Sequence, residues 1–251
     1  MYLTRMELDM RRKKTMLAFA NRRLFHGAVE AAFEGERKRR LWRIDRLGNA
    51  CYLLIVSEDK PNLQFAFEQF GPYQKEPYWE TKFYDILLDR IENGSRWQFR
   101  LTANPTISSS KDRKDRNGES IAAQKEKEDK NKADNDTTEK DTENKDIKNT
   151  ETKSKRGTVY AHSVERFQRD WFKNRTEKNG FHVEDRDLAI VQSQWVQFTK
   201  RQEGNRVSFI SVTYEGILTV MDKDAFVRVL KEGIGREKAY GMGMLTVMRI
   251  L

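Results

Sequence analysis

The sequence predicts an α+β protein made of two tandem units with a long insertion between them. In residues 2–103, strand-like alternation and helix-like periodicity follow one another in the order strand, helix, strand, strand, helix, strand. A similar series of segments returns after residue 158, whereas residues 106–157 have a composition that cannot support a packed core. These observations predict two ferredoxin-like (RRM-like) units, residues 1–105 and 158–251, separated by a disordered insertion.

The N-terminal unit opens with apolar and polar residues that alternate through residues 2–10, which predicts a half-buried strand. An exposed basic turn is expected at residues 11–14. Asn21 is a suitable N-cap for a helix that reaches Gly35, because apolar residues recur after it at helical spacing.

Four further segments complete this unit. Residues 38–46 and 51–57 indicate paired strands, residues 63–70 a short helix, and residues 96–103 the closing strand. The apolar segment 84–91 is an extra piece with no assigned place.

The insertion differs in kind from the rest of the chain. Residues 108–157 contain no aromatic residue, and they carry fourteen Lys or Arg against thirteen Asp or Glu. Fixing the backbone of each residue costs about 1–2 kcal/mol of conformational entropy, and this segment of roughly 50 residues has too little apolar surface to offset the total. We therefore expect it to be disordered.

The C-terminal unit is expected to take its opening strand from the residues just before Tyr160. Residues 163–178 then predict a helix with an aromatic face, and Asp222 is a suitable cap for a second helix. Further strands are expected at residues 181–183, 188–198, 207–220 and 244–251.

Composition narrows the class of protein. The chain is 37% apolar and 35% charged, and no apolar run approaches the roughly 18 residues of a membrane span. One cysteine and three histidines offer no credible metal cluster, and the N-terminus lacks the apolar core of a secretion signal. We expect a cytoplasmic protein with no metal, no small-molecule cofactor and no membrane partner.

The charge points to a polyanionic partner. The net charge is +9, and residues 1–46 alone hold thirteen Lys or Arg against six Asp or Glu. A block this basic favours nucleic acid binding, although charge says nothing about catalysis.

Residues 233–243, which we call the glycine segment, carry four glycines around Arg236 and Lys238. Glycine accepts positive φ angles, and successive backbone N–H groups beside two cations favour phosphate. A helix C-cap followed by a tight turn would explain the glycines equally well. Neither the P-loop pattern nor the dinucleotide fingerprint is present, so no nucleotide cofactor is expected.

The three histidines are the candidates for proton transfer if the partner is RNA. Cleavage by the 2′-hydroxyl needs a base, an acid and cations at the phosphate, and histidine titrates near neutral pH. His182 lies in an expected strand and is interpreted as structural. His162 precedes the C-terminal helix as a cap or phosphate contact. His26 lies beside the apolar stripe of the first helix, one turn after Arg22 and Arg23.

Several motifs resemble the CasE family of CRISPR repeat-processing endoribonucleases, which act in Cascade-type complexes. The opening Met-Tyr-Leu-Thr-Arg and Asn21-x-x-x-x-His26 are similar, as are the run from Phe99 to Pro105 and the pair Lys155-Arg156. Tyr-Glu-Gly-Ile-Leu-Thr-Val at 214–220 and the closing glycine segment complete the resemblance, which covers nearly the whole chain outside 108–154.

This resemblance implies a tandem ferredoxin-like fold that binds the stem-loop of a CRISPR repeat. It implies cleavage at the 3′ base of the stem without metal, leaving a 5′-hydroxyl and a 2′,3′-cyclic phosphate. The expected partners are the repeat RNA hairpin and other Cascade subunits, with the enzyme remaining bound to its product.

The resemblance also assigns residues. His26 matches the family's first-helix histidine in the acid or base role. Arg23 stands where some members have a tyrosine; it cannot transfer protons at neutral pH but can stabilise the phosphorane, which leaves the second proton-transfer group open. The expected RNA-binding residues are Arg22, Lys155, Arg156, Gly233, Gly235, Arg236, Lys238, Gly241 and Gly243.

Two other classes of protein fit the same basic surface. One is a non-catalytic subunit that binds an RNA hairpin in a ribonucleoprotein. The other is a basic DNA-binding protein, which would bind duplex DNA as tightly as a stem-loop RNA.

Overall fold

The computed structural model describes residues 1–36, 38–73, 76–109, 158–199 and 206–250. Residues 1–106 and 161–251 form one compact unit, and residues 107–160 form another. In the second, β6 (Thr106–Ser109) pairs with β7 (Thr158–Ala161). The disordered insertion was expected to begin at residue 106, but residues 106–109 form β6. The rest of the expected insertion, residues 110–157, lies outside the described residues.

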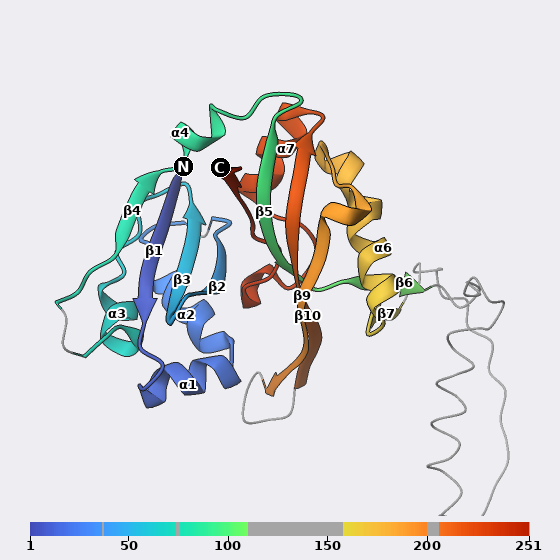
Figure 1. Cartoon of the computed structure of the whole chain (residues 1–251). Helices are drawn as coiled ribbons and strands as arrows, with labels where there is room; N and C mark the ends of the chain where they lie inside the picture. Colours follow the sequence, from blue (N-terminus) through green and yellow to red (C-terminus); the bar gives the residue numbers. More distant parts are fainter. Residues whose placement is uncertain (37, 74–75, 110–157, 200–205, 251) are drawn as a thin grey trace, which may run out of the picture. The chain divides into compact units, whose positions relative to one another are not determined.

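The first sheet of the larger unit has the order β2-β3-β1-β4 and is antiparallel throughout (Figure 1). As the alternation predicts, Thr4, Met6 and Leu8 of β1 are buried. In this order β1 lies between β3 and β4, as the first strand of a ferredoxin-like unit does. The strands are β1 (Tyr2–Leu8), β2 (Leu41–Leu47), β3 (Ala50–Ser57) and β4 (Glu80–Phe83).

The helices of this part bury an aromatic core against the sheet. Phe25 and Phe70 pack with Trp42 of β2, and the Phe25 ring lies 4.9 Å from that of Phe70. One helix, α1, was missed, because the basic run 11–14 was interpreted as a turn; the chain bends between α1 and α2 at Asn21. The helices are α1 (Lys13–Ala20), α2 (Arg23–Ala31), α3 (Gln64–Phe70) and α4 (Asp85–Leu88).

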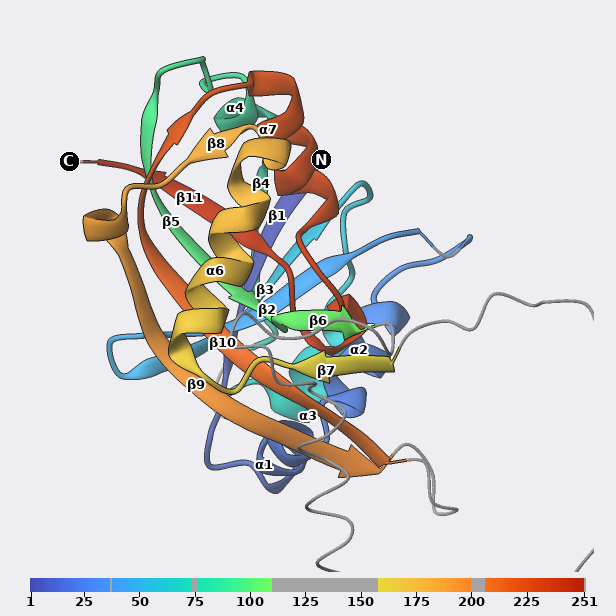
Figure 2. The ribbon, with the colours of Figure 1, turned by 90° about the vertical axis from the view of Figure 1, so that its right-hand side faces the viewer.

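The second sheet has the order β11-β5-β10-β8, with β9 also paired to β10. Helix α6 runs along this sheet in Figure 2, and its Phe172 stacks on Phe99 of β5. Phe226 of α7 belongs to the same core. The elements are β5 (Arg96–Ala103), α6 (Glu165–Thr176), β8 (Phe181–His182), β9 (Leu188–Thr199), β10 (Arg206–Val220), α7 (Lys223–Glu232) and β11 (Leu245–Arg249).

The place of β5 corrects the predicted division of the chain. β5 was expected to close the N-terminal unit, but it pairs with β10 and β11, and β4 closes the first sheet instead. β4 is short and partly exposed, so it has no hydrophobic alternation to reveal it. The chain therefore leaves the first sheet after β4 and enters the second with β5. The insertion follows β5 in sequence, so it interrupts the second ferredoxin-like unit after its first strand.

The tandem ferredoxin-like fold itself is confirmed. In the first sheet β1 lies between β3 and β4, and in the second sheet the opening strand β5 lies between β10 and β11, with β8 and β9 both paired to β10. The opening strand of the second unit is β5, so the expectation that residues before Tyr160 supply it is wrong. Among the described residues, no helix combines the length and apolar character needed to cross a bilayer.

Strand β2 joins the cores of the two sheets. Leu41 belongs to the core of the second sheet and its neighbour Trp42 to that of the first. The next residue along β2, Arg43, is only 2% exposed and donates hydrogen bonds to the carbonyl of Arg100 in β5 and to the hydroxyl of Thr246 in β11. Because β2 is covered on both faces, it packs against residues of both ferredoxin-like units.

Candidate nucleic-acid interface

Helix α2 holds His26 at the edge of the core. The preceding residue, Phe25, is fully buried, whereas His26 is half-buried, so its imidazole lies where the helix leaves the interior. The imidazole faces the ring of Tyr240 edge to face, at a centroid distance of 6.4 Å and an interplanar angle of 73°. Helix α2 and the glycine segment, which are about 200 residues apart in sequence, therefore meet at His26.

Arg22 makes a second connection between these elements. Its Nη1 donates a 3.3 Å hydrogen bond to the backbone carbonyl of Tyr240. Burial lowers the pKa of Arg22 to about 10, which still leaves the guanidinium charged at neutral pH. The Arg22 guanidinium is thus a cation held one helical turn before His26, and both residues contact Tyr240.

Arg23, the other predicted catalytic residue, begins α2 and has an exposed side chain. Its backbone N–H donates to Oδ1 of Asn21 at 3.3 Å, which satisfies one of the free donors at the helix start. Asn21 therefore serves the start of α2 as predicted, although the N-cap position itself is Arg22.

The glycines of the glycine segment have a geometric function. Gly233, Gly235, Gly241 and Gly243 all have φ between 73° and 85°, and Gly233 is the C-cap of α7. A Cβ on Gly241 would lie 2.7 Å from the Trp42 ring, and one on Gly243 would lie 2.5 Å from the carbonyl of Ile234. The C-cap and tight-turn interpretation is therefore correct for these positions.

The segment nevertheless presents donors and cations. Within the described part of the chain, the backbone N–H groups of residues 235–239 donate to no protein acceptor. Arg236 is exposed, and Lys238 is half-buried. Burial lowers the pKa of Lys238, nearby Arg39 lowers it further, and Glu232 acts in the opposite direction. Two cations two residues apart on a turn with free N–H groups are suited to an anion.

The remaining predicted residues lie elsewhere. Lys155 and Arg156 are outside the described residues. His162 stacks on Phe167 at 5.6 Å, and burial together with Arg175 lowers the pKa of its imidazole. His182 is exposed on β8, with Nε2 3.3 Å from a carboxylate oxygen of Glu184.

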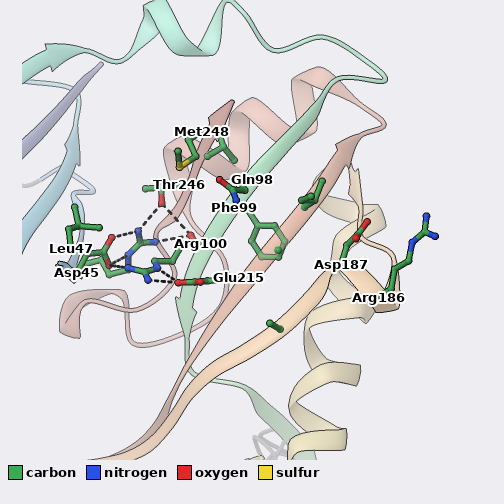
Figure 3. A pocket seen from close by; sticks show the side chains of 15 residues that line it. Asp45, Leu47, Gln98, Phe99, Arg100, Arg186, Asp187, Glu215, Thr246 and Met248 are labelled. Carbon is green, nitrogen blue, oxygen red and sulfur yellow. Dashed lines mark hydrogen bonds and ion pairs between the residues drawn. The ribbon is translucent and has the colours of Figure 1, made fainter. Parts of the chain in front are cut away.

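A separate groove of 650 Å³ opens where β2 meets the second sheet (Figure 3). Asp45, Arg100 and Glu215 form an ion-pair network along its wall. The cations and carboxylates that line it balance each other, and no described residue among those predicted to bind RNA lines it. This groove therefore differs from the cationic contact at His26.

Sequence reasoning missed two residues of this region, Tyr240 beside His26 and Arg39 beside Lys238. Tyr240 lies within the glycine segment, but only the glycines and cations of that segment were singled out. Arg39 was interpreted only as part of a strand, and it lies just before β2, near Lys238. No sequence spacing connects either residue with His26, because the contact forms between distant segments.

Comparison with known proteins identifies a family for this chain. The model of a family described as "CRISPR associated protein" matches residues 1–249. The CRISPR-associated endoribonuclease Cse3 of Thermus thermophilus is 27% identical over 85 residues, which are 31% of this chain. The matched region spans 40% of that relative's length.

Solved structures share the fold over nearly the whole chain. Thermus thermophilus Cse3 bound to an RNA that represents a pre-cleavage complex superposes with a TM-score of 0.66 at 21% identity, covering 99% of this chain and 98% of that one. A chain of a CRISPR RNA-guided surveillance complex in a pre-nicking state gives 0.59 at 18% identity, with 100% of both chains covered.

The fold and the contact at His26 define a tandem ferredoxin-like protein with a cationic contact between helix α2 and a glycine-rich turn. The family match extends over almost the entire sequence, so this chain belongs to the CRISPR-associated protein family. The resemblance to the CasE family stated from the motifs is thereby confirmed.

Proposed function

We propose that this protein is an endoribonuclease that processes CRISPR RNA as a subunit of a Cascade-type complex. It binds the stem-loop of a CRISPR repeat and cuts at the 3′ base of the stem. The family match supports this proposal, as does the similarity to a relative named as a CRISPR-associated endoribonuclease. The shared fold with an RNA-bound Cse3 and with a chain of a surveillance complex is consistent with it.

The observation that carries the proposal is the position of His26 against a cationic turn. A half-buried imidazole contacts Tyr240 of the glycine segment, and Arg22 bonds to the same residue. Lys238 and the free N–H groups of residues 235–239 lie on that segment. A proton-transfer group beside an anion-binding surface is what cleavage of a phosphodiester requires.

The reaction follows from the chemistry of RNA. The 2′-oxygen attacks the adjacent phosphorus as its proton passes to a base, and the bond from phosphorus to the 5′-oxygen breaks as that oxygen receives a proton. The products are a 2′,3′-cyclic phosphate and a 5′-hydroxyl. His26 serves as base or acid in this step. Because the nucleophile belongs to the substrate, we expect cleavage to proceed without a metal ion.

The cations stabilise the charge that develops on the phosphate. Arg22 and Lys238 are both partly buried, so their charges are less screened than those of surface residues. Arg23 is exposed and contributes attraction for RNA or stabilisation of the phosphorane, because a guanidinium cannot transfer protons at neutral pH.

The test is incubation of the purified protein with a labelled repeat hairpin in EDTA. The wild type should give a single cut. His26→Ala should abolish cleavage. Its affinity for a repeat RNA hairpin that lacks only the attacking 2′-hydroxyl (the 2′-deoxy hairpin) should stay within about threefold of the wild-type affinity. His182→Ala is the matched control, because it removes another histidine that lies on β8, away from α2.

Other outcomes decide between the classes of protein. Binding of the hairpin without any cut by the wild type would favour the non-catalytic RNA-binding subunit. Equal affinity for duplex DNA and for the hairpin at the same salt concentration would favour the DNA-binding class.

A further inference from the structure

Tyr240 is held in a fixed orientation by the hairpin of β9 and β10. The residue is 8% exposed, and its ring packs edge to face on Phe198 at 5.0 Å, with Phe209 stacked on it at 6.1 Å. Met242 completes this small core. Since rings packed on several sides keep one rotamer, the Tyr240 ring is a rigid surface.

The same residue faces two polar side chains of the α2 region. Its ring lies edge to face with the imidazole of His26, and its carbonyl accepts the hydrogen bond from Arg22. His26 and Arg22 are four residues apart, so both project from one side of the helix. One residue of the glycine segment therefore contacts both the candidate proton-transfer group and the cation next to it.

We propose that Tyr240 is a positioning residue for His26, and this inference rests on the proposed function. A histidine at the edge of a helix has several rotamers, whereas proton transfer needs its nitrogen within hydrogen-bond reach of the reacting oxygen. The rigid Tyr240 ring restricts the imidazole to the rotamers that meet it edge to face. It thereby links the folding of the β9–β10 hairpin to the geometry at the scissile phosphate.

Three variants test this role. Tyr240→Leu removes the ring that faces His26, and Tyr240→Phe keeps the ring without the hydroxyl. Phe172→Leu is the control, because it removes a buried ring from the core of the second sheet, outside the Tyr240 cluster. Each is assayed for the single-turnover rate on the repeat hairpin and for affinity towards a 2′-deoxy hairpin. Thermal unfolding of each variant reports its stability.

Tyr240→Leu should slow cleavage by about 10- to 100-fold, as expected for a misplaced catalytic group, with the affinity nearly unchanged. Tyr240→Phe should retain a rate within about threefold of wild type, because the ring performs the positioning. Phe172→Leu should lower stability while cutting at nearly the wild-type rate, because Phe172 lies in the core of the second sheet and not in the Tyr240 cluster.

A readout in the free protein separates this inference from the proposed function. The chain has only three histidines, so the imidazole resonances of His26 can be assigned with His26→Ala. Tyr240→Leu should shift them, because the ring current is lost, and Phe172→Leu should not. This result is expected even if the wild type does not cut RNA.

Specific outcomes would overturn the positioning role. They are unchanged His26 resonances in Tyr240→Leu, a wild-type cleavage rate in that variant, or equal losses of rate and affinity. If Tyr240→Phe lost as much activity as Tyr240→Leu, the phenol would take part in the chemistry and Tyr240 would not be merely a positioning residue.

Discussion

The guanidinium of Arg43 binds the carboxylate of Asp45, two residues further along β2. Nε and Nη2 donate hydrogen bonds of 2.7 and 2.6 Å to the two carboxylate oxygens. The other donors reach the carbonyls of Arg100 and Met244 and the hydroxyl of Thr246. All five N–H groups of a buried arginine are thus used, and strands of both sheets are joined by one side chain.

This arrangement predicts that Arg43→Ala is severely destabilising. Removing one partner of a buried ion pair costs about 3–5 kcal/mol of the free energy of unfolding, and here, among the described residues, it leaves the Asp45 carboxylate with only a 3.7 Å ion pair to Arg100. Asp45 is 6% exposed, and the backbone carbonyls of Arg100 and Met244 would lose the donor they share. Urea denaturation of the variant and the wild type measures the difference.

Arg46→Ala is the control for this prediction, because Arg46 lies on the same strand and is exposed. Its effect should stay within about 0.5 kcal/mol. Equal losses for the two variants would show that the Arg43 network does not stabilise the fold.

Gly241→Ala should destabilise the protein more than Gly94→Ala. Both glycines have φ of 80°, so both variants incur the same left-handed strain of about 1–2 kcal/mol. A Cβ at Gly94 has nothing within 4 Å, whereas one at Gly241 would lie 2.7 Å from the Trp42 ring. That clash should add about 1–3 kcal/mol, as over-packing does. Thermal or urea unfolding compares the pair, and equal effects would mean that Trp42 yields without cost.

Arg236→Ala and Lys238→Ala should each flatten the salt dependence of RNA binding. Each phosphate contact contributes about one counterion released, so the slope of log K against log salt should fall by about one unit for each variant. Affinity for the 2′-deoxy hairpin is measured at several salt concentrations. Lys223→Ala, an exposed lysine at the start of α7, is the control. An unchanged slope in both test variants would mean that the segment serves only the fold.

Lys238 should also make stability depend on pH. Burial first, and then Arg39, lower its pKa below the ordinary 10.5, so folding favours the neutral amine. The resulting penalty is complete below the lowered pKa and disappears as pH rises through that value towards 10.5. At pH 7 we therefore expect Lys238→Met to be more stable than the wild type while binding RNA more weakly.

Urea unfolding of Lys238→Met and the wild type at neutral and alkaline pH tests this sign. The advantage of the variant should shrink as pH rises. A variant that is less stable than the wild type at pH 7 would contradict the argument. Lys231→Met, on the last turn of α7, is the matched control.

The fold could be predicted where periodicity was strong. The alternation of β1 and the helical stripe behind Phe25 were identified because each buries one regular face against the core. α1 was missed because its basic start resembled a turn. β4 was missed because a short edge strand has no apolar face, and β5 was then assigned to the wrong sheet.

The sequence by itself indicated the family, the location of His26 on a helix near the N-terminus and the need for glycine in the closing turn. The family follows from motifs that resemble CasE, and the other two follow from local spacing. Only the tertiary structure decided that Tyr240 and Arg22 meet beside His26, and that β5 pairs with β10 and β11. The physical reason is that strand pairing and side-chain contacts between distant segments depend on which surfaces become buried together, and no local pattern encodes that choice.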